Sequence, residues 1–469
     1  MLRGARRITL LAGLLLAGLS ATSAQNNDWT TCAKASGHAA LAACDRVIGS
    51  GQYTGRVLAL AYSNRGVEWT AKGDVGRAIA DYDQAIQHDS SQAAAFHNRG
   101  IARASKRDFD NAIADYDEAI RLNPKYASAF ADRGVAYFNK GDHARAIPDY
   151  DESIRLAPDA VSLNNRGNAY ASRGDYDRAI RDFDEAVTLD PRYAIGFYNR
   201  GNAHYAKGDP DRAIANYDQA LAIDPKYQDA LVNRGVAHER KGQIDQAIRD
   251  YDEAIKIDSK DAVAFNNRGN ALLKRGQPVR AIADYDQSLR LDNRQVSAYF
   301  SRGIAHESRK QFIAAMTDYD HVTRLQPANF AAWNSRCWAR AVVGQLQTAL
   351  ADCNEALRLK PDFVNALDSR AFVHLKSGRY DDAITDYDAA LRLDPAKVAS
   401  LYGRGMAKRR KQDFAGSNID IAAARAIRAE VSAEFARYGI NPPVTEAPRG
   451  EAERPVQLEA ERPVPRTPF

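Results

Sequence analysis

The chain has 469 residues, of which 45% are hydrophobic and 27% charged, and its 65 basic and 60 acidic residues leave a formal net charge of +5. This composition is typical of a globular protein and excludes a disordered chain or a membrane-embedded bundle. The near-neutral balance does not provide the basic surface with which proteins usually bind a nucleic-acid backbone, so no nucleic-acid partner is expected.

The N-terminal segment has the three parts of a secretory signal. Residues 1–7 are basic, residues 8–21 form an apolar run, and small residues follow up to Ala24. The alternative is a membrane anchor, but a spanning helix needs about 20 apolar residues, more than this run contains. We therefore predict that residues 1–24 are a signal peptide, that the mature chain is exported to the periplasm or secreted, and that it has no stable membrane insertion.

From residue 59 onward the sequence repeats itself. Arginine followed by a small residue, usually glycine, recurs eleven times between Arg65 and Arg404, in nine steps of 34 residues and one of 33. Each unit combines this small residue in a first predicted helix, a breaker that is usually glycine, and a second predicted helix that usually carries Asp-Tyr-Asp or a close variant. A proline closes most units. A fixed period of this length is typical of solenoids built from helix pairs.

The spacing, the small residues and the closing proline resemble those of the tetratricopeptide-repeat family. The resemblance covers about residues 59–437 and implies an all-α, right-handed superhelical solenoid of about eleven helix–turn–helix repeats. Residues 25–58 are predicted to form an N-terminal capping half-repeat with a cysteine pair, and residues 414–438 a final helix that caps the stack. Residues 438–469 are rich in Pro, Glu and Arg and are predicted to be a disordered tail.

One repeat position departs from that family, because arginine stands in all eleven units where the family usually has leucine. We expect each arginine to pair with aspartates of its own or a neighbouring second helix. For Arg200 the expected partners are Asp182 and Asp184 on the preceding second helix and Asp218 on its own. The alternative is a row that binds phosphate or carboxylate ligands, but pairing at every unit favours architecture, since a ligand site would be local.

The four cysteines fall at matched repeat positions. Cys337 replaces the small residue of its unit and Cys353 the second-helix tyrosine, while Cys44 occupies the position equivalent to Cys353 and Cys32 a shortened first helix. Of the three possible connectivities we expect the local disulfides Cys32–Cys44 and Cys337–Cys353, formed in an oxidising compartment. Four buried thiols are the alternative. Neither pair has zinc-finger spacing, so no metal site is expected.

The sequence contains no phosphate-binding glycine loop, zinc-protease helix or nucleophile elbow, so we expect neither enzyme activity nor a cofactor. The histidines share one repeat position, three residues after the small residue, at His204, His238, His306 and His374. Equivalent positions lie two helices apart, with about 8–10 Å per helix layer, too far for two histidines to share a metal. We interpret them as packing residues.

The resemblance also implies a groove lined by the first helices. In that family the positions two and three before the small residue, and one after it, face the groove. Asparagines occupy these positions in many units: Asn64, Asn98, Asn165, Asn199, Asn233, Asn267, Asn168, Asn202 and Asn270. An amide can satisfy both the N–H and the C=O of an extended peptide, as the similar asparagine row of O-linked N-acetylglucosamine transferases does. The alternative is that the asparagines stabilise the scaffold.

Farther along the chain the predicted groove becomes apolar and aromatic, with Trp338 and Phe372 at inward-facing positions. Clustered exposed aromatic residues usually mark a binding surface. The alternative is that the curved stack covers some of them. The sequence therefore predicts a non-enzymatic scaffold that binds extended peptide segments or partner proteins in its groove. A periplasmic chaperone-like protein, or a factor for the assembly of the envelope or of secretion machinery, is the alternative.

Overall fold

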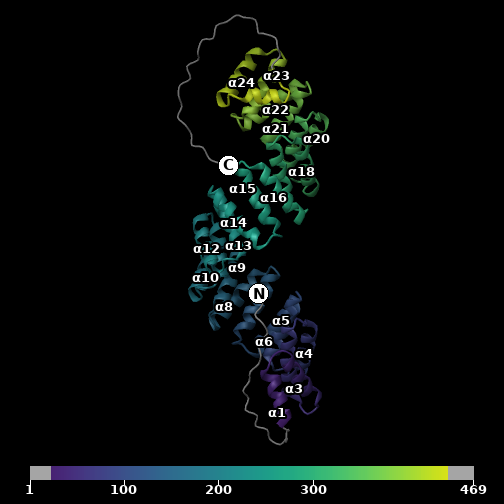
Figure 1. Ribbon diagram of the computed structural model, residues 1–469, viewed down its shortest axis with the longest axis vertical. Helices are drawn as coiled ribbons and strands as arrows, with labels where there is room; N and C mark the ends of the chain where they lie inside the picture. Colours follow the sequence, from purple (N-terminus) through teal and green to yellow (C-terminus); the bar gives the residue numbers. More distant parts are fainter. Residues whose placement is uncertain (1–22, 442–469) are drawn as a thin grey trace. The chain divides into compact units, whose positions relative to one another are not determined.

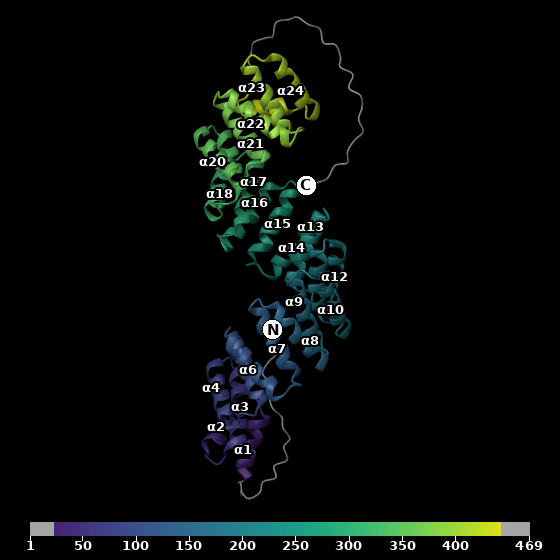
Figure 2. The same ribbon diagram turned by 180° about the vertical axis from the view of Figure 1, so that it is seen from behind.

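The computed structural model describes residues 23–441, and the predicted signal peptide lies almost entirely outside this range. Over the described residues the chain forms 25 α-helices and no strand, which confirms the predicted all-α fold (Figures 1 and 2). No helix in this range is long and apolar enough to span a bilayer. Consecutive helices pack as pairs, and each pair packs against the next within its unit.

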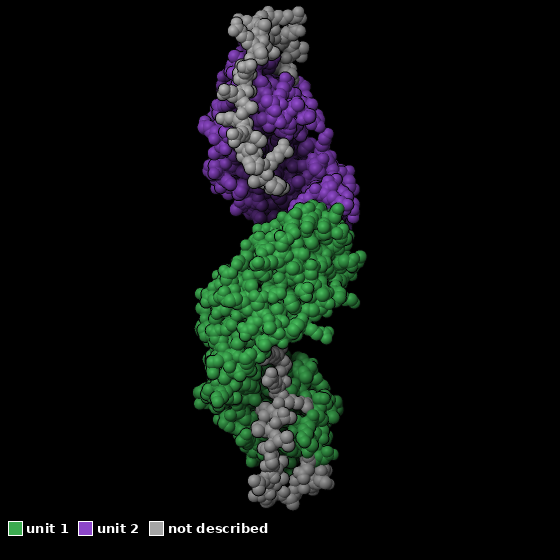
Figure 3. All heavy atoms as spheres, turned by 90° about the vertical axis from the view of Figure 1, so that its left-hand side faces the viewer, with its two compact units in different colours: residues 1–259 green, residues 260–469 purple. Residues whose placement is uncertain are grey.

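The chain divides into two compact units, residues 1–259 and residues 260–469 (Figure 3). The helices of the first unit are α1 (Ser23–Lys34), α2 (His38–Gly49), α3 (Gly55–Ala71), α4 (Val75–His88), α5 (Ala93–Ser105), α6 (Phe109–Leu122), α7 (Ala127–Asn139), α8 (His143–Leu156), α9 (Ala160–Ser172), α10 (Tyr176–Leu189), α11 (Ala194–Ala206), α12 (Pro210–Ile223), α13 (Gln228–Arg240) and α14 (Ile244–Ile257). Those of the second unit are α15 (Ala262–Lys274), α16 (Pro278–Leu291), α17 (Val296–Ser308), α18 (Phe312–Leu325), α19 (Phe330–Val342), α20 (Leu346–Leu359), α21 (Val364–Lys376), α22 (Tyr380–Leu393), α23 (Val398–Arg410), α24 (Phe414–Ile427) and α25 (Val431–Arg437).

Helices α3 to α24 make eleven pairs, one for each repeat recognised in the sequence, and α1 and α2 form a further pair before them. We call the odd-numbered helices from α1 to α23 first helices and the even-numbered helices from α2 to α24 second helices. The single final helix predicted over residues 414–438 is two helices. The reason is that Arg428, which follows α24, has an extended backbone, as does the residue after most other second helices. The last second helix therefore ends there like the others, and α25 is a separate helix.

The turn inside each repeat is short and has a defined chemistry. In most repeats the second residue after the first helix is a glycine with positive φ, such as Gly73 (φ 78°). In six of the eleven repeats an aspartate then caps the second helix. The Asp74 side chain, for example, accepts a hydrogen bond from the Arg77 backbone N–H at 3.1 Å. Three non-glycine residues adopt the same left-handed conformation, namely Arg107, Lys310 and Gln412. The turn geometry is therefore kept even where the residue type disfavours it.

The core of each repeat is a contact between the small residue and the second-helix aromatic ring sixteen positions later. A Cβ atom on Gly100 would lie 2.6 Å from Cε1 of Tyr116, so only glycine lets the ring lie this close to the first helix. Tyr116 is fully buried. Because the contact recurs in most units, helices of about 14 residues that would be marginal alone are stabilised by packing.

Candidate functional site

In most repeats the arginine is bound by two second helices. Arg99 holds the Asp115 carboxylate through Nε (3.1 Å) and Nη2 (2.6 Å), and its Nη1 donates to Asp83 of the preceding second helix at 2.6 Å. The Asp115 side chain is 3% exposed and that of Asp83 47%. The predicted pairing is thus confirmed, and the guanidinium groups are used by the scaffold itself.

Most other units repeat this arrangement. The buried carboxylate and the preceding second-helix partner, in that order, are Asp81 and Asp45 for Arg65, Asp149 and Asp117 for Arg133, Asp182 and Asp151 for Arg166, Asp250 and Asp218 for Arg234, Asp318 and Asp286 for Arg302, Asp352 and Asp320 for Arg336, Asp386 and Asn354 for Arg370, and Asp420 and Asp388 for Arg404. These contacts give the residues on the first helices a fixed frame.

Arg200 differs from the expectation. It binds Asp184 at 2.5 Å as predicted, but its partner on its own second helix is the Asn216 side-chain oxygen at 2.5 Å. Asp182 pairs with Arg166 and Asp218 with Arg234. The reason is that each arginine reaches the first acidic position of its own second helix and the second acidic position of the preceding one, and asparagine occupies the first position here.

Both predicted cysteine pairs lie at bonding distance. The Sγ–Sγ distance is 2.04 Å for Cys32–Cys44 and 2.00 Å for Cys337–Cys353. All four residues are buried. In the second pair the disulfide takes the place that the glycine–tyrosine contact has in neighbouring repeats.

The histidines of the shared repeat position contact the buried aspartates. The Nε2 atoms of His238, His306 and His374 lie 3.8, 3.9 and 3.6 Å from carboxylate oxygens of Asp250, Asp318 and Asp386. In another unit Arg340 occupies this position and donates to Asp352 at 2.7 Å. Burial lowers the pKa of His374. Within the described residues, no group of three or more His, Cys, Asp or Glu side chains is arranged to hold a metal ion.

We define the first-helix face as the surface formed by the positions three and two before the small residue and one after it. In the first unit its amides contact one another: Asn199 donates to the Asn164 side-chain oxygen at 2.8 Å, and Asn233 donates to that of Asn202 at 2.9 Å. Asn202 also accepts from the Tyr217 hydroxyl at 2.8 Å. The structure therefore brings neighbouring members of the predicted row together and uses part of their hydrogen-bonding capacity inside the protein.

The remaining asparagines are placed differently. Asn64 and Asn98 are buried, whereas Asn165, Asn168 and Asn267 are half-buried. Asn270, also half-buried, accepts a hydrogen bond from the Tyr285 hydroxyl at 2.9 Å. The accessible part of the row thus begins at the fourth repeat.

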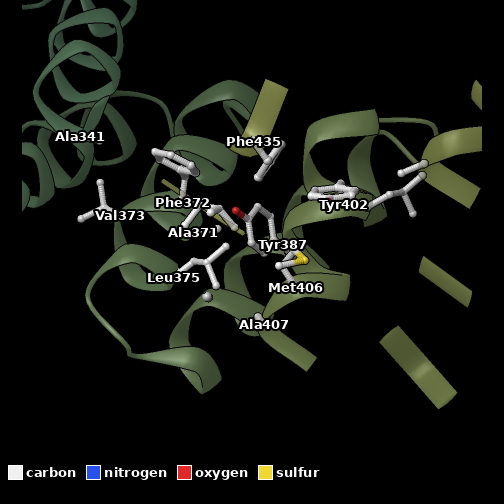
Figure 4. Close-up of a cluster of buried hydrophobic side chains, with 14 of the residues drawn as sticks. Ala341, Ala371, Phe372, Val373, Leu375, Tyr387, Tyr402, Met406, Ala407 and Phe435 are labelled. Carbon is white, nitrogen blue, oxygen red and sulfur yellow. The ribbon is translucent and has the colours of Figure 1, made fainter. Parts of the chain in front are cut away.

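In the second unit the first-helix face of α19, α21 and α23 is covered by the chain's own C-terminal segment (Figure 4). The Phe435 ring of α25 lies 5.9 Å from that of Phe372 and 4.8 Å from that of Tyr402, measured between centroids. Tyr438 packs edge-on against Trp338 at 5.2 Å. Phe372 is consequently only 1% exposed and does not line an open surface, while Trp338 stays half-buried.

The same contacts correct the predicted start of the tail at residue 438. Tyr438 and the buried Ile440 belong to the packed structure. The remainder of the predicted tail, residues 442–469, lies outside the described residues. Sequence reasoning missed this return of the chain because α25 has only seven residues and follows the end of the repeat pattern.

A pocket of about 410 Å³ opens beside this covered surface, within the second unit. Its lining includes Glu307 of α17, Asn334 and Trp338 of α19, Asp368 of α21 and Lys397 at the start of α23. Sequence reasoning assigned no role to its charged residues. Asp368 stands three positions before a small residue, where the family pattern would have placed it on the first-helix face.

Burial governs the charge state of the two carboxyl groups on the inner walls. It raises the pKa of Glu307 to about 7, while the hydroxyl of Tyr319 beside it acts in the opposite direction. Burial also raises the pKa of Asp368, which accepts a hydrogen bond from the Ser400 hydroxyl at 2.5 Å. The pocket therefore holds two carboxyl groups that are costly to ionise without a cation.

Family comparisons agree with this architecture. Models described as TPR repeat match residues 167–208 and 373–411, and models described as tetratricopeptide repeat match residues 97–161, 198–262 and 250–283. The chain is a tetratricopeptide-repeat protein. Such solenoids present extended concave surfaces and serve as scaffolds for protein–protein interaction.

No curated protein sequence matches the chain. Among solved structures it is similar to a MamA protein, with 27% identity over 35% of this chain and 96% of that chain and a TM-score of 0.33. It is also similar to pilF of Pseudomonas aeruginosa, with 21% identity over 45% and 96% of the two chains and a TM-score of 0.42. A third similar structure is that of the APC/C hetero-tetramer Cut9-Hcn1, with 12% identity over 86% and 92% of the two chains and a TM-score of 0.45.

Proposed function

We propose that the protein is a non-enzymatic scaffold that binds polypeptide segments of partner proteins on its first-helix face. The observation that supports this proposal is the packing of α25 against the first-helix face in the second unit. There the first-helix face of α19, α21 and α23 already carries a short segment of polypeptide, held by Phe435 and Tyr438.

The physical argument is that α25 owes its order to this surface. A helix of seven residues has too few internal hydrogen bonds to be stable in water. Its side chains Val431 and Phe435 are buried in the apolar cluster of the second unit, where the Phe435 ring contacts Phe372 and Tyr402 of the first helices, so the apolar contact supplies the stability. A surface that orders one short segment has the chemistry to order a similar segment from another protein.

The first unit offers the same face with a different chemistry. Its half-buried amides, among them Asn165, Asn199 and Asn233, present donors and acceptors that suit the backbone of an extended peptide. Each such contact contributes about 0.5–1.5 kcal/mol net. Affinity would therefore come from many small contacts that depend little on the sequence of the peptide.

The two disulfides support a further part of the proposal, that the scaffold works in an oxidising compartment such as the periplasm. A chaperone-like or envelope-assembly role would be one use of such a scaffold.

Selection of binders from short random peptides tests the proposal, followed by measurement of their Kd. Replacement of Asn165, Asn199 and Asn233 of the first unit by alanine should weaken the binding of the selected peptides by roughly 1.5–4.5 kcal/mol, from the same value for each hydrogen bond. Helicity should persist, because alanine favours helix. The matched control replaces three exposed second-helix residues of the first unit, namely Gln87, Glu185 and Gln219. Unchanged affinity in the folded asparagine variant would refute the amide row as the binding surface.

A further inference from the structure

We propose that the pocket of the second unit binds a lysine or arginine side chain of the partner polypeptide. This inference rests on the proposed function and names the side-chain chemistry that one part of the first-helix face selects. The pocket is formed by successive first helices on one side and by the turn before α23 and residues Arg428 and Glu434 on the other.

The charges in the pocket are not balanced. Four acidic residues line it (Glu307, Asp368, Asp394 and Glu434) against two basic ones (Lys397 and Arg428), a difference of 4 − 2 = 2 negative charges when all are ionised. Both cations already have contacts, since Lys397 Nζ donates to the Asn365 side-chain oxygen at 2.6 Å and Arg428 lies 3.3 Å from Glu434.

The two carboxyl groups on the inner walls differ from the other buried acids of this protein. The buried aspartates that bind the repeat arginines each face a guanidinium group, as Asp318 faces Arg302 at 2.6 Å. Asp368 instead accepts from the Ser400 hydroxyl, and Lys397 adds only a longer-range attraction. Glu307 lies beside the hydroxyl groups of Tyr319 and, farther away, Tyr438. A cation from outside would supply what the repeat arginines supply elsewhere.

Glu239 in the first unit separates this interpretation from a purely structural one. It occupies the same repeat position as Glu307 and accepts a hydrogen bond from the Tyr251 hydroxyl at 2.7 Å. A glutamate next to the second-helix tyrosine is therefore compatible with packing alone. What Glu307 adds is its place on a pocket wall together with Asp368 and Trp338.

Trp338 suits the rest of a basic side chain. Its half-buried indole forms part of the wall, and an aromatic ring attracts a cation and packs against the methylene stem of lysine or arginine. The pocket thus combines an apolar wall for the stem with carboxyl groups for the charged end.

The experiment uses the full chain and four capped peptides of alanine and serine that differ only at the central residue: lysine, arginine, norleucine or glutamate. Binding is measured by fluorescence polarisation and calorimetry. We expect the lysine and arginine peptides to bind about tenfold more tightly than the norleucine peptide, as a charge-assisted hydrogen bond implies. Glu307→Gln with Asp368→Asn should abolish this preference and leave norleucine binding unchanged, and the matched control Glu239→Gln should keep it.

Calorimetry in two buffers of different ionisation enthalpy measures the number of protons released on binding. A purely structural role of Glu307 would not change this number. Near pH 7 the lysine peptide should release protons from the parent, because the cation lowers the pKa of Glu307, and Glu307→Gln should lose most of this release. If all peptides bind alike, or if the preference survives both substitutions, the pocket proposal is overturned while the first-helix face remains a binding surface. If no peptide binds at millimolar concentration to the second unit or elsewhere, the proposed function fails with it.

Discussion

Arg336 of α19 binds the carboxylate of Asp352 in α20 through Nε at 2.9 Å and Nη2 at 2.8 Å, and the same guanidinium donates to Asp320 of α18 at 2.7 Å. One side chain thus connects three helices that belong to two repeats. Its side chain is only 8% exposed, which makes it the most deeply placed of the repeat arginines with a described contact.

Arg336→Ala should therefore be strongly destabilising. The substitution leaves the buried Asp352 carboxylate with only Arg340 as a cationic partner, and breaking a buried pair typically costs about 3–5 kcal/mol. Urea unfolding followed by circular dichroism measures the change. The control Arg358→Ala removes an exposed pair with Glu355 and should change the stability little. Equal effects of the two substitutions would mean that the repeat arginines act only as surface charges.

Asn216→Asp should stabilise the first unit. The change gives Arg200 the carboxylate that the other repeat arginines have, in exchange for the Asn216 amide bond to the Arg212 carbonyl at 2.8 Å. We expect a gain of about 1 kcal/mol, because a charge-assisted contact replaces a neutral one. The midpoint of urea unfolding reports it, and Arg200→Ala combined with Asn216→Asp should cancel the gain. A loss of stability in the single variant would contradict the prediction.

The stability of the second unit should depend on Glu307 between about pH 4.5 and pH 7. Burial raises the pKa of Glu307 from its ordinary 4.5 to about 7, so the folded state binds the proton more tightly than the unfolded state. The contribution of Glu307 to the free energy of unfolding is fully present below the ordinary pKa of 4.5 and is lost as the pH rises through the folded-state pKa of about 7. The parent should therefore lose stability relative to Glu307→Gln over this range. Asp368, whose pKa is also raised, and the neutral Tyr319 and Tyr438 contribute equally to both proteins.

Thermal unfolding by circular dichroism at a series of pH values checks this expectation. Glu185→Gln, which changes an exposed carboxyl group, serves as the control and should follow the parent at every pH. A constant difference between the parent and Glu307→Gln would show that the carboxyl group is not buried in solution.

The Cys337–Cys353 disulfide should be replaceable by the glycine–tyrosine pair of the neighbouring repeats. We expect the reduction of this one bond to cost the parent about 3 kcal/mol of stability, since the bond closes a loop of sixteen residues. Cys337→Gly with Cys353→Tyr should fold, because Gly303 and Tyr319 make this contact one repeat earlier. Only the Cys32–Cys44 bond should then respond to reductant. Failure of the double variant to fold while Cys337→Ala folds would show that the repeats are not equivalent here.

Most of the fold could be predicted because the residues of its main contact stand sixteen positions apart in most repeats. The small residue and the aromatic ring sixteen positions later, as in Gly100 and Tyr116, appear in the sequence at the same spacing in unit after unit. The arginine partners could be predicted for the same reason. Two of the partners expected for Arg200, Asp182 and Asp218, are wrong. Each arginine contacts the first acidic position of its own second helix and the second acidic position of the preceding one, and the spacing alone does not show this geometry.

The candidate site was harder to predict, because it depends on residues outside the repeat pattern. The aromatic positions Trp338 and Phe372 were recognised, but not the segment that covers them, since the seven residues of α25 carry no repeat signal. The pocket carboxyl groups of Glu307 and Asp368 come from different repeats of the second unit and look like ordinary surface acids in the sequence. Only their common burial beside α25 gives them a shared role.

The step of 33 residues shows that the arginine contacts tolerate a change in the length of a repeat. One residue is missing between Asp151 and Arg166, yet Nη1 of Arg166 still reaches that carboxylate at 2.7 Å, as in units of full length. A long side chain that makes its contact despite a shortened linker relaxes the demand for an invariant unit length. Because most of the repeat arginines join a repeat to its predecessor by the same contact with an aspartate, a duplicated or deleted segment of 34 residues within a unit would keep this contact at the new junction. The length of the binding surface can thus vary in evolution, or by design, without a new interface having to arise.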